Sequence, residues 1–156
     1  MNDSFFLKQA IELAKKYSVD GQHGPFGAII VQNQQVIGKG WNKVVAHQDP
    51  TAHAEINAIR NACANIESHE LNQTTIYSSC EPCPMCLSAI YWARIPRLVF
   101  ASDKKDAAKA GFDDQFIYQQ IVLESTQRSL KTIQLMPQQG WSVFEAWIQN
   151  QNRVKY

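Results

Sequence analysis

Two short motifs constrain the fold of this chain more strongly than any other feature of its sequence. The first is His53–Glu55, which reads His-Ala-Glu, and the second is Pro82–Cys86, which reads Pro-Cys-Pro-Met-Cys, with 27 residues between Glu55 and Cys83. Two cysteines three positions apart in the first turn of a helix lie on one face, within reach of one ion. His53 is placed to begin another helix and to supply a nitrogen ligand. The fold must therefore bring the starts of two helices together.

The ligand types in these motifs predict one zinc ion per chain, held by His53, Cys83 and Cys86. Thiolate and imidazole ligands together favour zinc over magnesium or calcium. Three protein ligands leave the fourth position for water, which is the arrangement of a catalytic zinc site. Glu55, two residues after His53, is placed to take a proton from that water and hand it to a substrate. We therefore predict a hydrolytic enzyme with Glu55 as its proton carrier.

A closed structural zinc site is the alternative to this reading. Cys80 lies near the second motif and would complete a site of three cysteines and His53 with no open position. Such a site would belong to a small zinc-stabilised interaction module, which has no use for Glu55. Cys80 ends a predicted strand and would need an awkward turn to reach the ion. Cys63 falls among alanines in a helical pattern and is expected in the core.

Periodicity along the chain predicts strands interleaved with helices, and hence a single three-layer α/β domain over residues 1–156. Ser4 is the expected cap of the first helix, and Asp49 or Thr51 that of the helix from Ala52. Pro84 suits the first turn of the helix that follows the second motif. The expected strands are 26–31, 36–41, 75–78, 98–101 and 132–136, and the expected helices 4–17, 52–64, 84–94, 116–123 and 141–149.

Composition and charge exclude several classes of partner. The 156 residues are 45% hydrophobic and 19% charged, with a formal net charge of +1. The sequence contains no stripe of basic residues of the kind that binds nucleic acid. No apolar stretch is long enough for a membrane-spanning helix, and the N-terminus lacks the apolar stretch of a secretion signal. We expect a cytoplasmic protein that acts on a small molecule, in which the four cysteines are metal ligands or core residues.

Four residues outside the metal motifs are candidates for substrate binding. The amide of Asn42 offers a donor and an acceptor that suit a purine edge, although a turn role is equally open. Phe26 and Trp92 are able to stack on a flat base, although core packing is the ordinary role of such residues. Ala54 is small, so its backbone can approach a flat ligand closely.

An acidic pair at Asp113 and Asp114 precedes the helical pattern that begins at Phe116. The ordinary role of such a pair is to cap that helix. A carboxylate also suits the N–H donors of an aminated base, because it only accepts hydrogen bonds when ionised. Both roles are compatible if Asp113 caps and Asp114 binds.

The combined motifs resemble the H-x-E…P-C-x-x-C pattern of the cytidine and deoxycytidylate deaminase superfamily, a pattern known in nucleobase deaminases. Within it, the chain most resembles bacterial guanine deaminases, nearly from end to end. The segments that carry this resemblance are GPFGAIIV from Gly24, DPTAHAEINAIR from Asp49, SCEPCPMCLSAIYWAR from Ser79, AGFDDQFIY from Ala110, and the final Tyr156. The resemblance implies a cytidine-deaminase-like α/β/α fold with a central mixed five-stranded sheet. It also implies zinc-dependent conversion of guanine to xanthine and ammonia.

The same resemblance assigns roles to the residues of the substrate pocket. Asn42 is implied to bind the purine, and Phe26 and Trp92 to line the pocket. Asp114 is implied to face the amino group of guanine and to be a possible second proton carrier. The resemblance further implies a homodimer that exchanges a C-terminal segment of about residues 137–156, so that Tyr156 enters the partner's pocket.

Other substrates remain open within the superfamily. A tRNA adenosine deaminase would act on a flipped base in RNA and would carry a basic binding face and a basic C-terminal helix. Cytosine or another small aminated heterocycle is a further alternative.

Overall fold

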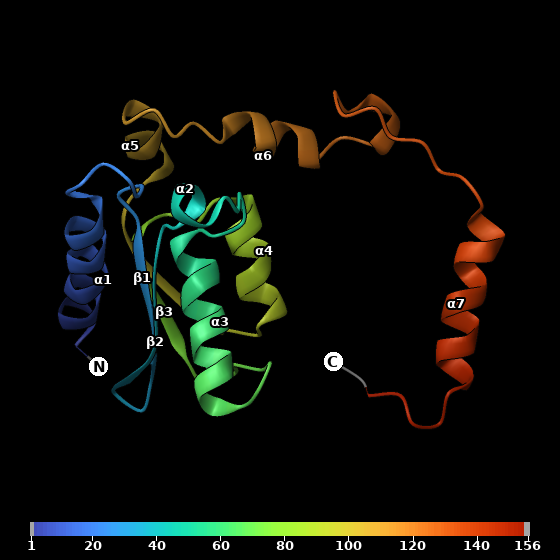
Figure 1. Cartoon of the computed structure of the whole chain (residues 1–156), viewed down its shortest axis with the longest axis horizontal. Helices are drawn as coiled ribbons and strands as arrows, with labels where there is room; N and C mark the ends of the chain where they lie inside the picture. Colours follow the sequence, from blue (N-terminus) through green and yellow to red (C-terminus); the bar gives the residue numbers. More distant parts are fainter. Residues whose placement is uncertain (1, 155–156) are drawn as a thin grey trace. The chain divides into compact units, whose positions relative to one another are not determined.

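The computed structural model describes residues 2–154 and divides the chain into two compact units, the first ending at Gln115 and the second beginning at Phe116 (Figure 1). The elements are, in chain order, α1 (Asp3–Ser18), β1 (Gly27–Gln32), β2 (Gln35–Trp41), α2 (Val44–His47), α3 (Ala54–Ile66), β3 (Thr75–Cys80), α4 (Pro84–Trp92), β4 (Arg97–Ser102), α5 (Lys104–Lys109), α6 (Gln115–Ile121), the 3-10 helix η1 (Ser125–Gln127) and α7 (Pro137–Gln149). Among the described residues, no helix combines the length and the apolar character that crossing a membrane requires.

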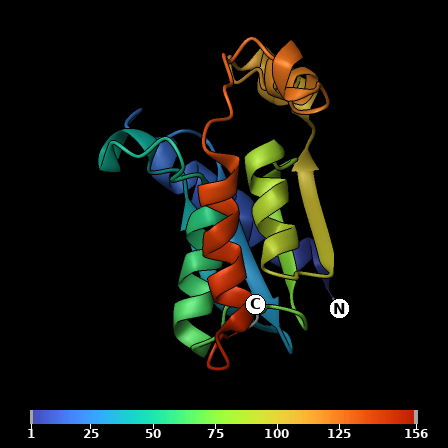
Figure 2. The same ribbon diagram turned by 90° about the vertical axis from the view of Figure 1, so that its right-hand side faces the viewer.

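The first unit is built on a mixed sheet with the strand order β2-β1-β3-β4. Strand β1 pairs antiparallel with β2 and β3, whereas β3 and β4 are parallel. Figure 2 shows β4 at one edge of this sheet. The mixed α/β fold expected from the sequence is confirmed, but the prediction of a fifth strand at 132–136 is wrong. That segment is exposed and has no regular structure, because an apolar run becomes a strand only where another strand pairs with it.

Helices cover both faces of the sheet, with α1 on one face and α3 and α4 on the other (Figure 1). Alternate side chains of β1 point to opposite faces, as the pleat of a strand requires. Ile29 packs with Phe6 and Ala10 of α1, whereas Ile30 packs with the helices on the opposite face. The continuous apolar run of β1 therefore reflects a strand that is buried on both sides.

Glycines of β2 allow α3 to lie unusually close to the sheet. A Cβ atom added to Gly40 would lie 2.1 Å from the carbonyl oxygen of Ala54, and one added to Gly38 would lie 2.5 Å from that of Ala58. Ala54, Ala58 and Ala62 form the facing ridge of α3, and each is 0% exposed. Small residues on both surfaces thus allow α3 to pack closely against β2. This close packing sets the position of the functional side chains in the first turn of α3.

The structure corrects one expected helix start and adds one helix that the sequence did not predict. Helix α1 begins at Asp3 and is capped by Asn2, whose side chain accepts a hydrogen bond from the backbone N–H of Phe5, so Ser4 lies inside the helix. Between β4 and the second unit, the structure also contains the short helix α5, which the sequence reading missed. Its cap is Asp103, whose side chain accepts from the N–H of Asp106.

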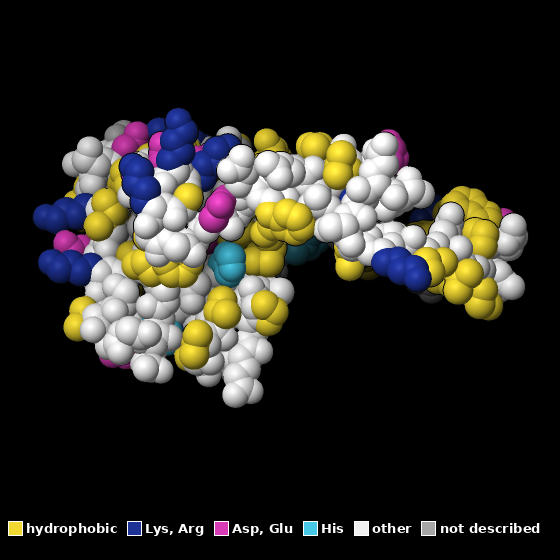
Figure 3. Space-filling view, turned by 90° about the horizontal axis from the view of Figure 1, so that it is seen from above, with side chains coloured by type: hydrophobic (Ala, Val, Ile, Leu, Met, Phe, Trp, Pro, Cys, Tyr) yellow, Lys and Arg dark blue, Asp and Glu magenta, His cyan; other side chains and the backbone are white. Residues whose placement is uncertain are grey.

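The second unit leaves its apolar side chains exposed. None of the described residues of α6 or α7 is buried. Figure 3 shows hydrophobic side chains on the surface of this unit. The exposed large apolar side chains of these two helices are Phe116, Ile117, Ile121, Trp141, Val143, Phe144, Trp147 and Ile148. An apolar face of this size on a helix is normally covered by other protein.

Candidate active site

Three ligand atoms converge at one end of the first unit. The sulfur atoms of Cys83 and Cys86 each lie 3.5 Å from Nδ1 of His53. The three atoms all lie within 4.8 Å of one another, and among the described residues they form the one such group of histidine, cysteine or acidic side chains. Two soft sulfur atoms and one imidazole nitrogen are a donor set that fits zinc.

The ligands meet because two helices begin at the same place. His53 directly precedes α3, and Cys83 directly precedes α4, both with extended backbone conformations. Pro84 occupies the first turn of α4, as expected, and the first turn brings Cys86 back beside Cys83. The predicted capping of α3 by Asp49 or Thr51 is wrong. Asp49 instead accepts hydrogen bonds from the backbone and the hydroxyl of Thr51, which makes a turn before the helix.

The three ligand side chains are hydrogen-bonded to one another, and these hydrogen bonds shift their pKa values. A hydrogen bond from Cys86 lowers the pKa of the Cys83 thiol, whereas donation to Cys83, together with burial, raises the pKa of Cys86. The hydrogen bond with Cys83 raises the pKa of His53. A divalent cation would replace these shared protons, because metals bind thiolates and neutral imidazole.

Glu55 lies in the first turn of α3, directly beside the ligand cluster. Its side chain is only 5% exposed, and this burial raises the pKa of its carboxyl group. Oε1 accepts a hydrogen bond from the hydroxyl of Ser78 at 3.1 Å, and Oε2 lies 3.4 Å from the sulfur of Cys86. A buried carboxyl with a raised pKa is suited to picking up and releasing a proton near neutral pH.

Cys80 does not join the ligand cluster. It ends β3, as the sequence predicts, and its thiol donates a long hydrogen bond of 3.7 Å to the carbonyl oxygen of Asp103. Burial raises the pKa of this thiol to about 11. Its sulfur is not among the ligand atoms that lie within 4.8 Å of one another, which favours the open three-ligand site over the closed one.

Asn42 is 8% exposed and is held through both its backbone and its side chain. Its N–H donates to the carbonyl oxygen of Phe26 at 3.1 Å, and its own carbonyl oxygen lies 2.8 Å from Nδ1 of His23. Its amide oxygen accepts from the N–H of Val44 at 3.2 Å. The turn role is therefore present, and it fixes the carboxamide at the end of β2. A Cβ atom added to Gly24 would lie 3.2 Å from the Asn42 side chain, so Gly24 leaves room for this arrangement.

An aromatic pair connects the end of the sheet to the loop that carries Asp114. The rings of Phe26 and Phe112 meet edge to face, with their centroids 4.9 Å apart. Burial raises the pKa of Asp114, and the charge of the Cys83 thiolate raises it further. Asp113 accepts a hydrogen bond from the backbone N–H of Gln115, the first residue of α6, and so forms a turn directly before that helix.

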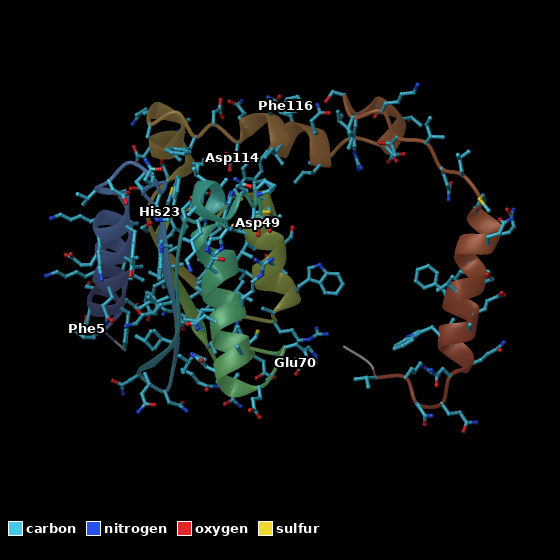
Figure 4. The ribbon with its side chains drawn as sticks, in the orientation of Figure 1. Phe5, His23, Asp49, Glu70, Asp114 and Phe116 are labelled. Carbon is cyan, nitrogen blue, oxygen red and sulfur yellow. The ribbon has the colours of Figure 1, made fainter. Side chains whose placement is uncertain are left out.

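In Figure 4 the labelled Asp114, Asp49 and His23 lie toward the end of the first unit at which α3 begins. Ala54 is fully buried immediately after His53. Trp92 is not brought to this end. It closes the opposite end of α4 and is 73% exposed. Tyr156 lies outside the described residues.

Three residues that contact the candidate site were not predicted from the sequence, namely Ser78, His23 and Phe112. Each makes its contact across a large sequence separation, so no local motif identifies it. The alternation of side chains along β3 is the one signal available for Ser78. That signal becomes useful only when the face of the sheet that carries the site is known.

Comparisons with known proteins agree with this geometry. Residues 1–102 match the family model for the cytidine and deoxycytidylate deaminase zinc-binding region. The guanine deaminase of Bacillus subtilis (strain 168) is 45% identical over 156 residues, which covers all of both chains. An X-ray structure of guanine deaminase from Bacillus subtilis matches with a TM-score of 0.96, covering 100% of this chain and 99% of that one at 45% identity.

A second group of relatives matches a shorter part of the chain. The tRNA-specific adenosine deaminase of Buchnera aphidicola subsp. Schizaphis graminum is 44% identical over 110 residues. That match covers 70% of this chain and 72% of the relative. The guanine deaminase and the tRNA-specific adenosine deaminase thus have nearly the same sequence identity to this chain. They differ in coverage, because the guanine deaminase matches all of the chain and the tRNA-specific enzyme matches 70% of it.

Proposed function

Because the chain belongs to the cytidine and deoxycytidylate deaminase family, we propose that it is a zinc-dependent enzyme that hydrolyses guanine to xanthine and ammonia. The observation that carries the reaction type is the convergence of His53, Cys83 and Cys86 beside the buried carboxyl of Glu55. The choice of guanine rests on the similarity to a guanine deaminase over the full length of both chains.

The chemistry divides between the metal and the side chains around it. A bound zinc ion supplies a Lewis acid that makes water nucleophilic at neutral pH. Glu55 accepts a proton from the attacking water and delivers it to N3 of guanine, which makes C2 more electrophilic. A new C2–O bond forms, the C2–N bond to the amino group breaks, and the second water proton leaves with the amino group as ammonia. Glu55 or Asp114 carries that second proton.

The remaining pocket residues are proposed to hold the base. The amide of Asn42 pairs with the purine edge, and Phe26 packs against the purine ring. Asp114 accepts a hydrogen bond from the amino group, and the backbone at Ala54 approaches the flat ligand. Trp92 ends α4 on the side away from the ligand cluster, and its place in the pocket wall is proposed on the resemblance to guanine deaminases alone.

A cytoplasmic location and a role in purine breakdown belong to the same proposal. All four cysteines are free thiols, which suits a reducing compartment.

An adenosine in tRNA is the second candidate substrate, favoured by the 44% identity to a tRNA-specific adenosine deaminase. We expect the zinc-loaded protein to deaminate free guanine at a rate insensitive to moderate salt. An RNA substrate bound through phosphates would lose about one log unit of affinity per log unit of salt for each phosphate neutralised. The measurement is ammonia release from guanine, adenine, cytosine, guanosine and a tRNA anticodon stem-loop at several salt concentrations. Salt-sensitive turnover of the stem-loop without turnover of guanine would contradict the proposal.

We further propose that the active form is a homodimer that exchanges its C-terminal segment, residues 137–156, between subunits. The support within the second unit is the exposed apolar side chains of α7, among them Trp141, Phe144 and Ile148. A helix with such a face is stabilised when another protein surface covers it. Exchange of an identical element between two copies is a low-cost route to such cover. In this arrangement Tyr156 of one chain reaches the pocket of the other.

Mixing two inactive variants tests this exchange. Glu55→Gln leaves the tail intact, and deletion of Tyr156 leaves Glu55 intact. In an exchanged heterodimer, one pocket combines an intact Glu55 with a donated Tyr156, so random pairing should restore about a quarter of wild-type activity. Subunit exchange is followed by mass spectrometry of differently tagged chains. Each variant alone is the control. An absence of recovery in a sample that contains heterodimers would refute the exchange and leave the zinc chemistry untouched.

A further inference from the structure

A serine of the central sheet contacts the proposed proton carrier. Ser78 lies in β3 and is 2% exposed, and its hydroxyl donates to Oε1 of Glu55 at 3.1 Å. Glu55 itself is 5% exposed, so water does not readily replace a lost partner. This contact joins β3 to the first turn of α3, 23 positions apart in the sequence.

The register of β3 decides which of two adjacent serines makes this contact. Ile76 belongs to the core cluster on the side of α3, and Tyr77 to the cluster on the side of α1. Side chains alternate along a strand, so Ser78 shares the face of Ile76 and Ser79 shares that of Tyr77. Ser79 accordingly makes a different contact, accepting from the backbone N–H of Gly27 at 3.0 Å. The two hydroxyls are both buried, but only that of Ser78 meets Glu55.

The two oxygens of the Glu55 carboxylate have different neighbours. Oε1 is bound to Ser78, whereas Oε2 lies 3.4 Å from the sulfur of Cys86, one of the three clustered ligands. The terminal torsion of a glutamate side chain is broad, so the backbone alone does not set the plane of the carboxylate. Once Cys86 binds a metal as a thiolate, it has no proton to donate. The Ser78 hydroxyl is a donor that remains.

We infer that Ser78 is a positioning residue, whose hydroxyl anchors Oε1 of Glu55 so that Oε2 stays directed toward the metal ligands. This inference rests on the proposed role of Glu55 in proton transfer. The Ser78 hydroxyl does not contact the substrate in this arrangement. It keeps one oxygen of the Glu55 carboxylate where the attacking water and the base exchange protons. Its loss should therefore lower kcat rather than weaken substrate binding.

The test is Ser78→Ala in the zinc-loaded full-length enzyme, with Ser79→Ala as the matched control. Removing a hydrogen bond to a charged buried group should lower kcat for guanine by about 10- to 100-fold. We expect the KM for guanine and the zinc content to stay near wild-type values. Ser79→Ala also removes a buried hydroxyl from β3 but should leave kcat within a few-fold. Ser78→Thr keeps the donor in a residue that suits a strand and should retain most of the rate.

Two further measurements separate positioning from a general structural effect. In a Glu55→Gln background, Ser78→Ala should lower the residual rate by much less than in the wild type, because residues that act through one group are not additive. A crystal structure of the zinc-loaded Ser78→Ala variant should show the Glu55 carboxylate rotated or in more than one orientation. Ser78→Cys, which has a weaker donor of similar size, serves the same test if the alanine variant does not fold.

Several outcomes would overturn the inference. These are an unchanged kcat in Ser78→Ala, an equal loss in Ser79→Ala, a loss of zinc, or a rise in KM without a fall in kcat. Failure of the proposed function is distinguishable, because the wild-type enzyme would then release no ammonia from guanine in the same assay. A defect confined to the Ser78 variants bears only on the positioning role.

Discussion

Replacing Glu55 with glutamine is expected to lower guanine turnover by at least about 100-fold while zinc and guanine remain bound. Glutamine keeps the shape of the side chain in a site where Glu55 is only 5% exposed, so the packing of α3 is preserved. It removes the group that titrates, and with it the path by which a proton passes from water to the base. The amide can still accept a hydrogen bond from Ser78, so the loss reports on proton transfer rather than on folding.

Steady-state kinetics, calorimetric binding of guanine and metal analysis of the same preparation check this result. Glu81→Gln is a matched control, because Glu81 lies close to the second motif in sequence and accepts from the backbone N–H of Lys104 instead of contacting the ligand cluster. Near-normal turnover in Glu55→Gln would mean that the proton carrier is elsewhere. Loss of zinc in the variant would mean that Glu55 serves the metal rather than the substrate.

Replacing Cys83 with serine is expected to remove most of the zinc and all measurable turnover. Its sulfur is one of three ligand atoms that lie within 4.8 Å of one another, and two protein ligands hold zinc poorly. Cys80→Ser is the matched control, because Cys80 is also buried and nearby but donates to the carbonyl oxygen of Asp103. We expect this variant to keep one zinc ion per chain and near-wild-type turnover.

Metal content by elemental analysis, together with turnover after dialysis against a chelator and readdition of zinc, separates the two sites. If Cys80→Ser loses its zinc, the closed four-ligand site is correct and the open catalytic site is wrong. If Cys83→Ser retains a full complement of zinc, the assignment of the ligands fails. In either case the fold of the first unit is checked by thermal unfolding of the same samples.

Local features of the fold were predictable because they depend on neighbours in the chain. The expected strands 26–31 and 36–41 leave a short polar segment between them, and the structure forms a turn there with positive φ angles at Asn33 and Gln34. Pro84 indicates the start of α4 for an equally local reason, since its fixed φ angle suits a first helical turn. The failures share the opposite cause. The run at 132–136 has the composition of a strand but no partner strand in the described structure, and pairing is a property of the whole sheet.

The sequence by itself determined the chemistry of the metal site, because it specifies the types of the ligands and places Cys83 and Cys86 close enough to share one helical turn. Tertiary structure alone decided which neighbours that site acquires. The register of β3 places Ser78 against Glu55, directs Ser79 to the other face, and leaves Cys80 outside the ligand cluster. These outcomes depend on the pairing of strands and on how closely α3 packs against β2. Such distances through space are set by the side chains of distant segments, which no local pattern encodes.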